Sequence, residues 1–270
     1  MTQTTVAIAG LGAIGLSVAR AIDQGRVPGF RLVSVASGNT AKARAALSDF
    51  AAPPPVRETA EELVDAEIVV EAAPAATFLD IARPAIAAGR TLIACSGGAL
   101  LRHFYLVDEA DQHGARIIVP TGALIGLDAV RAAAQGTIHS VLIETRKAPR
   151  GWLGAPFLTE RTMSLDNLEV PLCIFEGNAL EAAIGFPANV NVAAALAMAG
   201  IGPERTQIRL FADPHVERNT HRIEVEADVA RFSMTIEGVP NPENPRTGLL
   251  TPLSVIACLR GLKDTLKVGT

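Results

Sequence analysis

The chain has 270 residues, enough for one large domain or two modest ones. Its net charge of −4 argues against nucleic-acid binding. No uninterrupted apolar run reaches the roughly 18 residues that a transmembrane helix needs, so no membrane association is expected. Apolar residues make up 49% of the chain but aromatic residues only 4%, a composition that favours layered α/β structure.

The cysteines, Cys95, Cys173 and Cys258, are far apart in the sequence. Their spacing predicts neither a disulfide framework nor a metal cluster, and it favours a reducing compartment. The first apolar run has no basic region before it, which argues against a signal peptide. We therefore expect a cytoplasmic protein.

Strands and helices alternate through the first 120 residues. Apolar, β-branched runs predict strands at residues 5–9, 31–36, 67–72, 91–95 and 116–119. Helices are predicted at residues 16–23, 40–50, 75–88 and 101–114, with a turn at 96–98. The connections are too long for hairpins, so this half is predicted to form a doubly wound parallel sheet of the Rossmann type.

The pattern changes after residue 120. Strands are predicted at residues 138–146, 207–211, 221–229 and 231–237, and a helix at 189–198. Ile223 and Val225 alternate with Glu224 and Glu226, which indicates one buried and one solvated face. We expect a mostly antiparallel sheet with helices on one face.

These patterns predict an α/β protein of two domains. Residues 1–120 would bind a dinucleotide, and residues 121–245 would form an α+β domain for substrate binding and dimerisation. An apolar helix is predicted over residues 248–267, and the C-terminal segment 246–270 is expected to pack back on the first domain.

A glycine-rich loop follows the first predicted strand and opens the first helix. Gly10 permits a tight turn, Gly12 lets a pyrophosphate approach the backbone, and Gly15 lets helix and strand pack closely. The helix N-terminus, which includes Ala13 and Ile14, presents N–H groups to the phosphates. The loop predicts a nicotinamide dinucleotide cofactor, and the alternative is a turn that only packs or binds another ligand.

The end of the second strand bears on the choice between NAD and NADP. An acidic residue there would bind the ribose 2′-hydroxyl, but residues 36–40 contain no carboxylate, and Lys42 and Arg44 follow. Either cofactor is therefore expected, with Ser37 as a contact. Alternatively, Ser37 and Asn39 only shape a turn.

Glu71 ends the third predicted strand, near the expected nicotinamide edge of the sheet. It could shape the pocket wall or serve as a structural carboxylate. The sequence leaves its role open.

Five further segments occur in a distinctive order. They are TGALIGLDA at 121–129, ETRKAP at 144–149, FPANVNVA at 186–193, DPHVERNTH at 213–221 and NPENPRT at 241–247. In this order and spacing the chain resembles the L-aspartate dehydrogenase family over nearly its whole length. The resemblance implies NAD(P)-dependent oxidation of L-aspartate to iminosuccinate, which hydrolyses to oxaloacetate and ammonia and can feed NAD biosynthesis.

The resemblance also implies site residues. The family's active-site histidine maps onto His221, and its cofactor contacts map onto the glycine loop, Ala123 and Asn191. A histidine suits the chemistry, because the amine must be deprotonated before hydride leaves Cα. His221 could accept that proton or bind a substrate carboxylate, and a purely structural histidine is the alternative. His215 and His221 lack acidic or cysteine partners at ligand spacing, so no metal site is expected.

A dicarboxylate substrate needs cationic or amide partners. The candidates are Arg146, Lys147 and Asn191, together with His221. The alternative for Arg146 and Lys147 is a solvated strand end.

Two other functions stay open at this point. One is a related two-domain reductase of another small substrate, and the other is a non-catalytic dinucleotide sensor. The apolar character of the second sheet suggests a partner surface, and we expect a homodimer.

Overall fold

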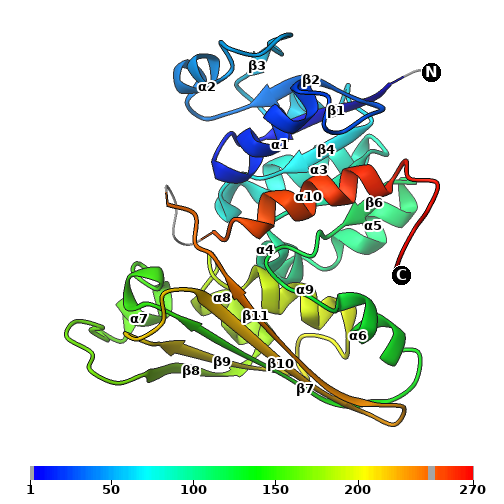
Figure 1. Ribbon diagram of the computed structural model, residues 1–270. Helices are drawn as coiled ribbons and strands as arrows, with labels where there is room; N and C mark the ends of the chain where they lie inside the picture. Colours follow the sequence, from blue (N-terminus) through cyan, green and yellow to red (C-terminus); the bar gives the residue numbers. More distant parts are fainter. Residues whose placement is uncertain (1–2, 243–246, 270) are drawn as a thin grey trace. The chain divides into compact units, whose positions relative to one another are not determined.

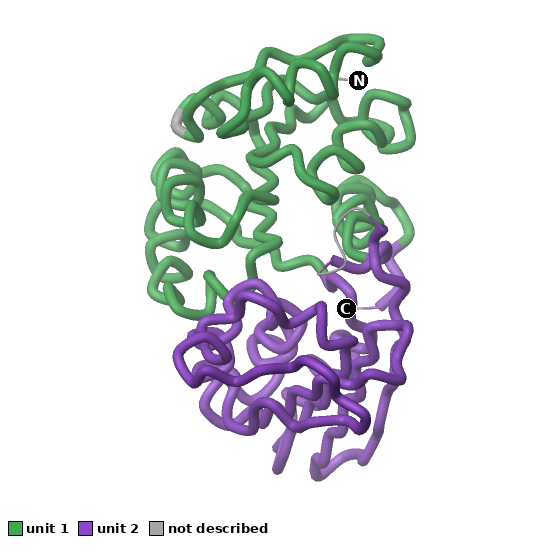
Figure 2. Tube along the Cα trace, turned by 90° about the vertical axis from the view of Figure 1, so that its left-hand side faces the viewer, with its two compact units in different colours: residues 1–120, 251–266 green, residues 121–250, 267–270 purple. Residues whose placement is uncertain are grey.

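The computed structural model describes residues 3–242 and 247–269. The chain folds into two compact units, which Figure 2 shows in different colours. Unit 1 comprises residues 1–120 and 251–266, and unit 2 comprises residues 121–250 and 267–270.

Unit 1 contains a six-stranded parallel sheet (Figure 1). Its strands are β1 (Thr4–Ala9), β2 (Phe30–Ala36), β3 (Val56–Arg57), β4 (Ile68–Glu71), β5 (Thr91–Ala94) and β6 (Arg116–Ile118). They lie in the order β3-β2-β1-β4-β5-β6, so the direction of winding reverses between β1 and β4. Ligands of doubly wound sheets bind at such a switch point, beyond the carboxyl ends of the strands. The predicted Rossmann-type fold is confirmed, although β3 was not predicted.

The helices of unit 1 follow the strands in turn. They are α1 (Ala13–Asp23), α2 (Thr40–Ala46), α3 (Phe78–Ala87), α4 (Gly97–Arg102), α5 (Leu106–Gln112) and α10 (Leu250–Gly261), with short 3-10 turns η1 (Glu61–Leu63) and η2 (Ala75–Thr77). The helix expected at 248–267 is shorter and spans Leu250–Gly261. The C-terminal segment 246–270, which was expected to pack back on the first domain, includes residues 246 and 270, and these two lie outside the described residues.

Two expectations near residue 100 were wrong. The predicted turn at 96–98 is the start of α4, because the backbone N–H groups of Ala99 and Leu100 donate to the carbonyl of Ser96 at 2.9 and 3.1 Å. The predicted helix 101–114 is interrupted, because the backbone leaves the helical conformation at His103 (φ −124°, ψ 41°). Gly97 and Gly98 indicated a turn in the sequence. In the structure, Ser96 is held by two hydrogen bonds to Glu71 of the neighbouring strand β4.

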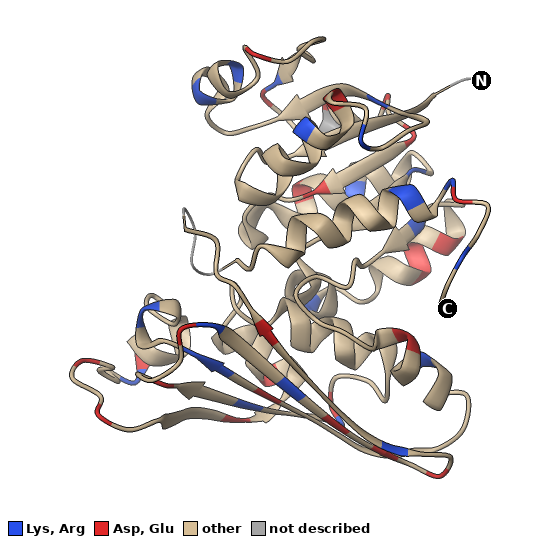
Figure 3. Cartoon of the chain, viewed as in Figure 1, with Lys and Arg blue, Asp and Glu red and all other residues tan. Residues whose placement is uncertain are grey.

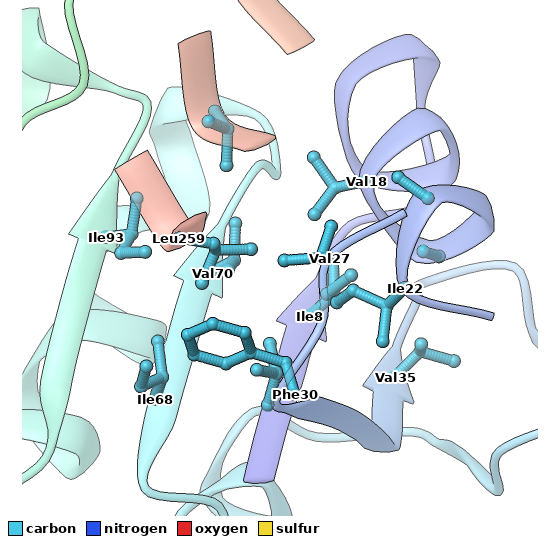
Figure 4. Close-up of a cluster of buried hydrophobic side chains, with 14 of the residues drawn as sticks. Ile8, Val18, Ile22, Val27, Phe30, Val35, Ile68, Val70, Ile93 and Leu259 are labelled. Carbon is cyan, nitrogen blue, oxygen red and sulfur yellow. The ribbon is translucent and has the colours of Figure 1, made fainter. Parts of the chain in front are cut away.

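The core on one face of this sheet joins distant parts of the chain (Figure 4). Ile8 and Val70 of the sheet pack in one buried cluster with Val18 of α1 and Leu259 of α10. Outside this cluster, α3 and α5 pack on each other and on β5 and β6. Helix α10 therefore completes the core of a unit whose other elements end before residue 121.

Unit 2 contains a five-stranded sheet in the order β11-β10-β7-β9-β8. Its strands are β7 (Ile138–Lys147), β8 (Leu172–Asn178), β9 (Thr206–Ala212), β10 (Asn219–Ala227) and β11 (Arg231–Gly238). Strands β7 and β9 are parallel, and the other neighbours are antiparallel. The predicted mostly antiparallel sheet is confirmed. Strand β8 was not predicted, because its sequence lacks clear alternation.

Short helices pack on one face of this sheet (Figure 1). They are α6 (Leu127–Ala133), α7 (Pro156–Glu160), α8 (Ala179–Gly185) and α9 (Asn191–Ala199), with the 3-10 turn η3 (Pro149–Gly151). On β10, Ile223 and Val225 are buried whereas Glu224 is exposed, as the alternation predicted.

Acidic and basic residues recur along the strands of this sheet (Figure 3), and the alternating burial of β9 and β10 places those at exposed positions on the opposite face. Arg209 pairs with Glu176 across β9 and β8, and Arg222 pairs with Glu224 on β10. Such exposed pairs stabilise the fold little, but they keep this face polar. Within residues 3–242 and 247–269, none of the helices has the length and apolar character needed to cross a bilayer.

Candidate functional site

The glycine loop links β1 to α1 at the switch point of the unit 1 sheet. Gly10 has φ +91°, and a Cβ there would lie 2.6 Å from the carbonyl oxygen of Ala72. A Cβ at Gly15 would lie 1.9 Å from the carbonyl oxygen of Gly10. Gly10 therefore requires glycine for both its conformation and its packing, and Gly15 requires glycine for packing.

Gly12 differs from its two neighbours in the motif. It is exposed, and a Cβ added there would meet nothing within 4 Å. Gly12 is also the N-cap of α1, and it offers no capping side chain to the helix N-terminus that begins with Ala13 and Ile14. Backbone N–H groups at such a terminus suit an anionic ligand, and the space beside Gly12 fits the pyrophosphate of a dinucleotide.

The end of β2 forms a compact turn. The backbone N–H of Asn39 donates to Ser37 Oγ at 3.3 Å, and Asn39 Oδ1 accepts from the backbone N–H of Lys42 at 2.9 Å, capping α2. Ser37 thus takes part in this turn, and its role as a cofactor contact stays a prediction. Its hydroxyl still lies at the strand end where a cofactor ribose is expected.

Glu71 is fully buried at the carboxyl end of β4. Its carboxylate accepts two hydrogen bonds from Ser96, one from the backbone N–H and one from the hydroxyl, both at 2.9 Å. Burial raises the pKa of Glu71 to about 7, although the hydrogen bonds from Ser96 oppose this shift. These contacts tie the ends of β4 and β5 together, which supports the structural interpretation of this carboxylate.

In unit 2, polar side chains occupy one end of the helix-covered sheet face. Thr145, Lys147 and His221 are only 2%, 3% and 4% exposed, and Asn189 is 7% exposed. Elsewhere the same face carries apolar side chains such as Ile143. We call these four residues the polar cluster. Buried polar groups destabilise a fold unless they are hydrogen-bonded, so their concentration at one end marks a site rather than ordinary core.

Within the polar cluster, His221 pairs with Thr145. The two residues are directly opposite in the antiparallel pair of β7 and β10, and Thr145 Oγ1 lies 2.9 Å from His221 Nδ1. Burial lowers the pKa of His221 to about 3, and the nearby charge of Lys147 contributes further. The imidazole is therefore neutral at physiological pH.

Lys147 lies two residues beyond Thr145 on β7, and its ammonium donates to Asn189 Oδ1 at 3.3 Å. Its Nζ also lies 4.9 Å from the ring centroid of the buried Trp152. A buried ammonium requires polar or anionic partners, so this position suits a carboxylate ligand. The interpretation of Lys147 as a solvated strand end was wrong.

Arg146 does not join the polar cluster. Successive strand residues point to opposite faces, and Arg146 pairs with Glu144 at 2.8 Å and with Asp213 at 3.3 Å. Its guanidinium lies 4.2 Å from the ring centroid of Phe211. Arg146 was expected to share a substrate site with Lys147, but the structure places the two on different faces.

The remaining expected residues lie near chain turns. Ala123 is partly buried in the turn after Gly122, which has φ +69°, and Asn191 is the partly buried first residue of α9. The segment 241–247, which contributed to the family resemblance, includes residues 243–246, which lie outside the described residues.

Comparisons with known proteins agree across the chain. Residues 128–262 match the family model described as aspartate dehydrogenase, C-terminal, and residues 10–120 match the NAD binding domain of homoserine dehydrogenase. An L-aspartate dehydrogenase of Bradyrhizobium diazoefficiens is 54% identical, covering 100% of this chain and 95% of that protein. The chain belongs to the L-aspartate dehydrogenase family. The family predicted from the sequence is thereby confirmed.

A second relative supports the same assignment, and one solved structure shares the fold. L-aspartate dehydrogenase 3 of Bordetella bronchiseptica is 47% identical over 98% of this chain and 97% of its own. The crystal structure of an aspartate dehydrogenase from Thermotoga maritima has a TM-score of 0.75, covering 99% of this chain and 100% of that one. Its identity of 23% limits that likeness to the fold.

Three residues near the sites were not predicted: Thr145, Asn189 and Ser96. Thr145 could have been found from the period of two in β7, which places positions 145 and 147 on one face. Asn189 lies in the same segment as Asn191, and only the contact with Lys147 distinguishes it. Ser96 carried no recognisable signal, because its partner Glu71 is 25 residues away.

Proposed function

We propose that this chain catalyses the reversible, NAD(P)-dependent oxidative deamination of L-aspartate. Unit 1 would bind the dinucleotide and unit 2 would bind the substrate. The observation that carries the proposal is the polar cluster, which combines a neutral histidine with a buried ammonium in a member of the L-aspartate dehydrogenase family.

The glycine loop fits the cofactor. The open space beside Gly12 and the uncapped start of α1 would hold the pyrophosphate, with Ser37 at the ribose end. When bound, the nicotinamide ring accepts a hydride in the forward reaction. No carboxylate occupies the end of β2, so no negative charge there would repel the 2′-phosphate of NADP. The charge at this strand end is therefore compatible with both NAD and NADP. Ala123 and Asn191 are proposed as further cofactor contacts, and Asn191 also as a substrate contact.

His221 would act on the substrate amine. The ammonium group must lose a proton before the Cα–H bond can break with its electron pair, and a neutral imidazole can take that proton. The substrate thus loses a proton from nitrogen and a hydride from Cα, which leaves protonated iminosuccinate. Water then adds to the imine carbon, and ammonium departs to give oxaloacetate.

Lys147 would bind a substrate carboxylate. Its side chain is 3% exposed, and it lies on the same face of β7 as Thr145, the partner of His221. An ammonium at such depth favours an anionic ligand over a neutral one. Arg146 lies on the opposite face, so it is not part of this proposal.

The test is a paired assay of NADH and NADPH formation with L-aspartate, with L-asparagine and L-alanine as matched substrates. Aspartate should be oxidised with at least one cofactor and strongly preferred, because asparagine and alanine lack the side-chain carboxylate. Dinucleotide binding by fluorescence without any turnover would instead favour the sensor. Turnover of another substrate alone would favour a different reductase.

We also propose that the protein is a cytoplasmic homodimer. The three cysteines are free thiols, which fits a reducing compartment. Phe232, Met234 and Ile236 of the edge strand β11 are only partly buried, which fits a partner surface. Sedimentation velocity would test the dimer, and a monomer at micromolar concentration would contradict it.

A further inference from the structure

The contact between His221 and Thr145 determines which nitrogen of the imidazole can meet a substrate. The two residues are 76 positions apart, yet the register of β7 and β10 places them opposite each other. Both residues are almost completely buried, and Nδ1 lies 2.9 Å from Oγ1. One ring nitrogen is therefore engaged, and only Nε2 is left to face a ligand.

A neutral imidazole carries one N–H and one lone pair. If Nδ1 holds the proton, it donates to Thr145 and Nε2 is an acceptor. If Nε2 holds the proton, Thr145 donates to Nδ1 and Nε2–H is a donor. The first arrangement makes His221 a base, and the second makes it a ligand for a carboxylate.

The proposed chemistry favours the first arrangement. Lys147 lies on the same face of β7, two residues beyond Thr145, and its charge reaches His221. Lys147 already supplies a cation for a substrate carboxylate, so the chemistry still requires an acceptor for the amine proton.

We propose that Thr145 is a positioning residue that accepts a hydrogen bond from Nδ1–H of His221 and thereby keeps Nε2 as the proton acceptor. This inference rests on the proposed function and deepens it, because it chooses between two roles for His221. Thr145 acts through His221 and does not touch the substrate.

Nitrogen NMR of protein labelled with ¹⁵N-histidine tests the tautomer without any substrate. The chain has five histidines, and the His221→Gln variant identifies the resonances of His221 by their loss. We expect a protonated, pyrrole-type Nδ1 and an unprotonated, pyridine-type Nε2 at neutral pH. The reverse assignment would overturn the proposal.

Two substitutions test the consequence for catalysis. Thr145→Ser keeps the hydroxyl and should retain kcat within about threefold, whereas Thr145→Val has a similar shape without it and should lower kcat by about tenfold to a hundredfold. The KM for the dinucleotide should not change in either variant. In Thr145→Val, the resonances of His221 should also show a mixture of the two tautomers in place of one. Wild-type kcat together with an unchanged tautomer in Thr145→Val would overturn the proposal.

The outcomes separate the two hypotheses. If the wild-type protein shows the expected tautomer but does not oxidise aspartate, the proposed function fails while the hydrogen-bond assignment stands. If aspartate is oxidised but Nδ1 is unprotonated, the role of Thr145 fails alone. Should Thr145→Val not fold, the wild-type spectrum and Thr145→Ser still decide the question.

Discussion

The two candidate sites of this protein are built in different ways. In unit 1, a stretch of six residues from Gly10 to Gly15 forms the cofactor loop from backbone groups. In unit 2, the polar cluster consists of side chains from β7, β10 and the segment before α9. A backbone site can be encoded by a local motif, whereas a side-chain site depends on strand register and on contacts between distant segments.

Each unit also contains a buried titratable group, Glu71 in unit 1 and His221 in unit 2, and burial shifts the pKa values of these two groups in opposite directions. It raises the pKa of Glu71 to about 7 and lowers the pKa of His221 to about 3. The cause is the same, because burial disfavours the charged form of either group. Glu71 ties two strand ends together, and His221 stays neutral.

The largest expected effect is the loss of His221. His221→Ala should lower kcat for aspartate by roughly a hundredfold to ten-thousandfold, because the proton acceptor is removed. Dinucleotide affinity, measured by fluorescence, should be unchanged, since the glycine loop lies in the other unit. Aspartate-dependent NAD(P)H formation within a few-fold of wild type would contradict the assignment.

Substitution of Lys147 should have the next largest effect. Lys147→Met removes the charge but keeps the length of the side chain, and it should raise the KM for aspartate by about tenfold to a hundredfold. Arg146→Gln is the matched control on the opposite face, and it should alter KM by less than about twofold. Equal effects of the two substitutions would contradict the assignment of the substrate site to one face.

The glycine loop offers a smaller, two-part test. Gly12→Ala meets open space, so it should cost less than about 1 kcal/mol of stability while raising the KM for the dinucleotide several-fold. Gly15→Ala would place its Cβ 1.9 Å from the carbonyl oxygen of Gly10, so it should cost about 1–3 kcal/mol. Thermal melts and cofactor titrations would measure both. The reverse order of stabilities would disprove this interpretation of the loop.

The last expected effect concerns stability against pH. The raised pKa of Glu71 gives stability that is present below about pH 4.5 and lost as pH rises through about 7. The lowered pKa of His221 gives stability that is present above about pH 6.5 and lost as pH falls toward 3. Between pH 4.5 and 6.5 the two contributions oppose each other.

Two glutamine variants separate these contributions. Relative to wild type, the melting temperature of Glu71→Gln should rise as the pH increases from 4.5 to 7, because only the wild type loses stability there. That of His221→Gln should fall relative to wild type from pH 4.5 to 6.5, because only the wild type gains. If the melting temperatures of both variants changed in the same direction relative to wild type as the pH increased, the result would be inconsistent with the two pKa shifts.

Much of the fold was predictable because periodicity and turn chemistry are local. The alternation of apolar runs and helices predicted unit 1, and the period of two in β10 predicted the buried face in unit 2. Strands β3 and β8 were missed, since one has two residues and the other lacks alternation. The interruption between α4 and α5 was missed because the sequence continues to favour helix there.

The amino-acid sequence was enough to predict the glycine loop, the family and the candidate His221, because each depends on residues that are close in the chain or on an ordered set of short segments. The folded chain was needed to pair His221 with Thr145 across 76 positions and Lys147 with Asn189 across 42. It also placed Arg146 on the opposite face from Lys147. These contacts depend on strand register and on helix packing over the sheet, and the identity of a residue specifies neither.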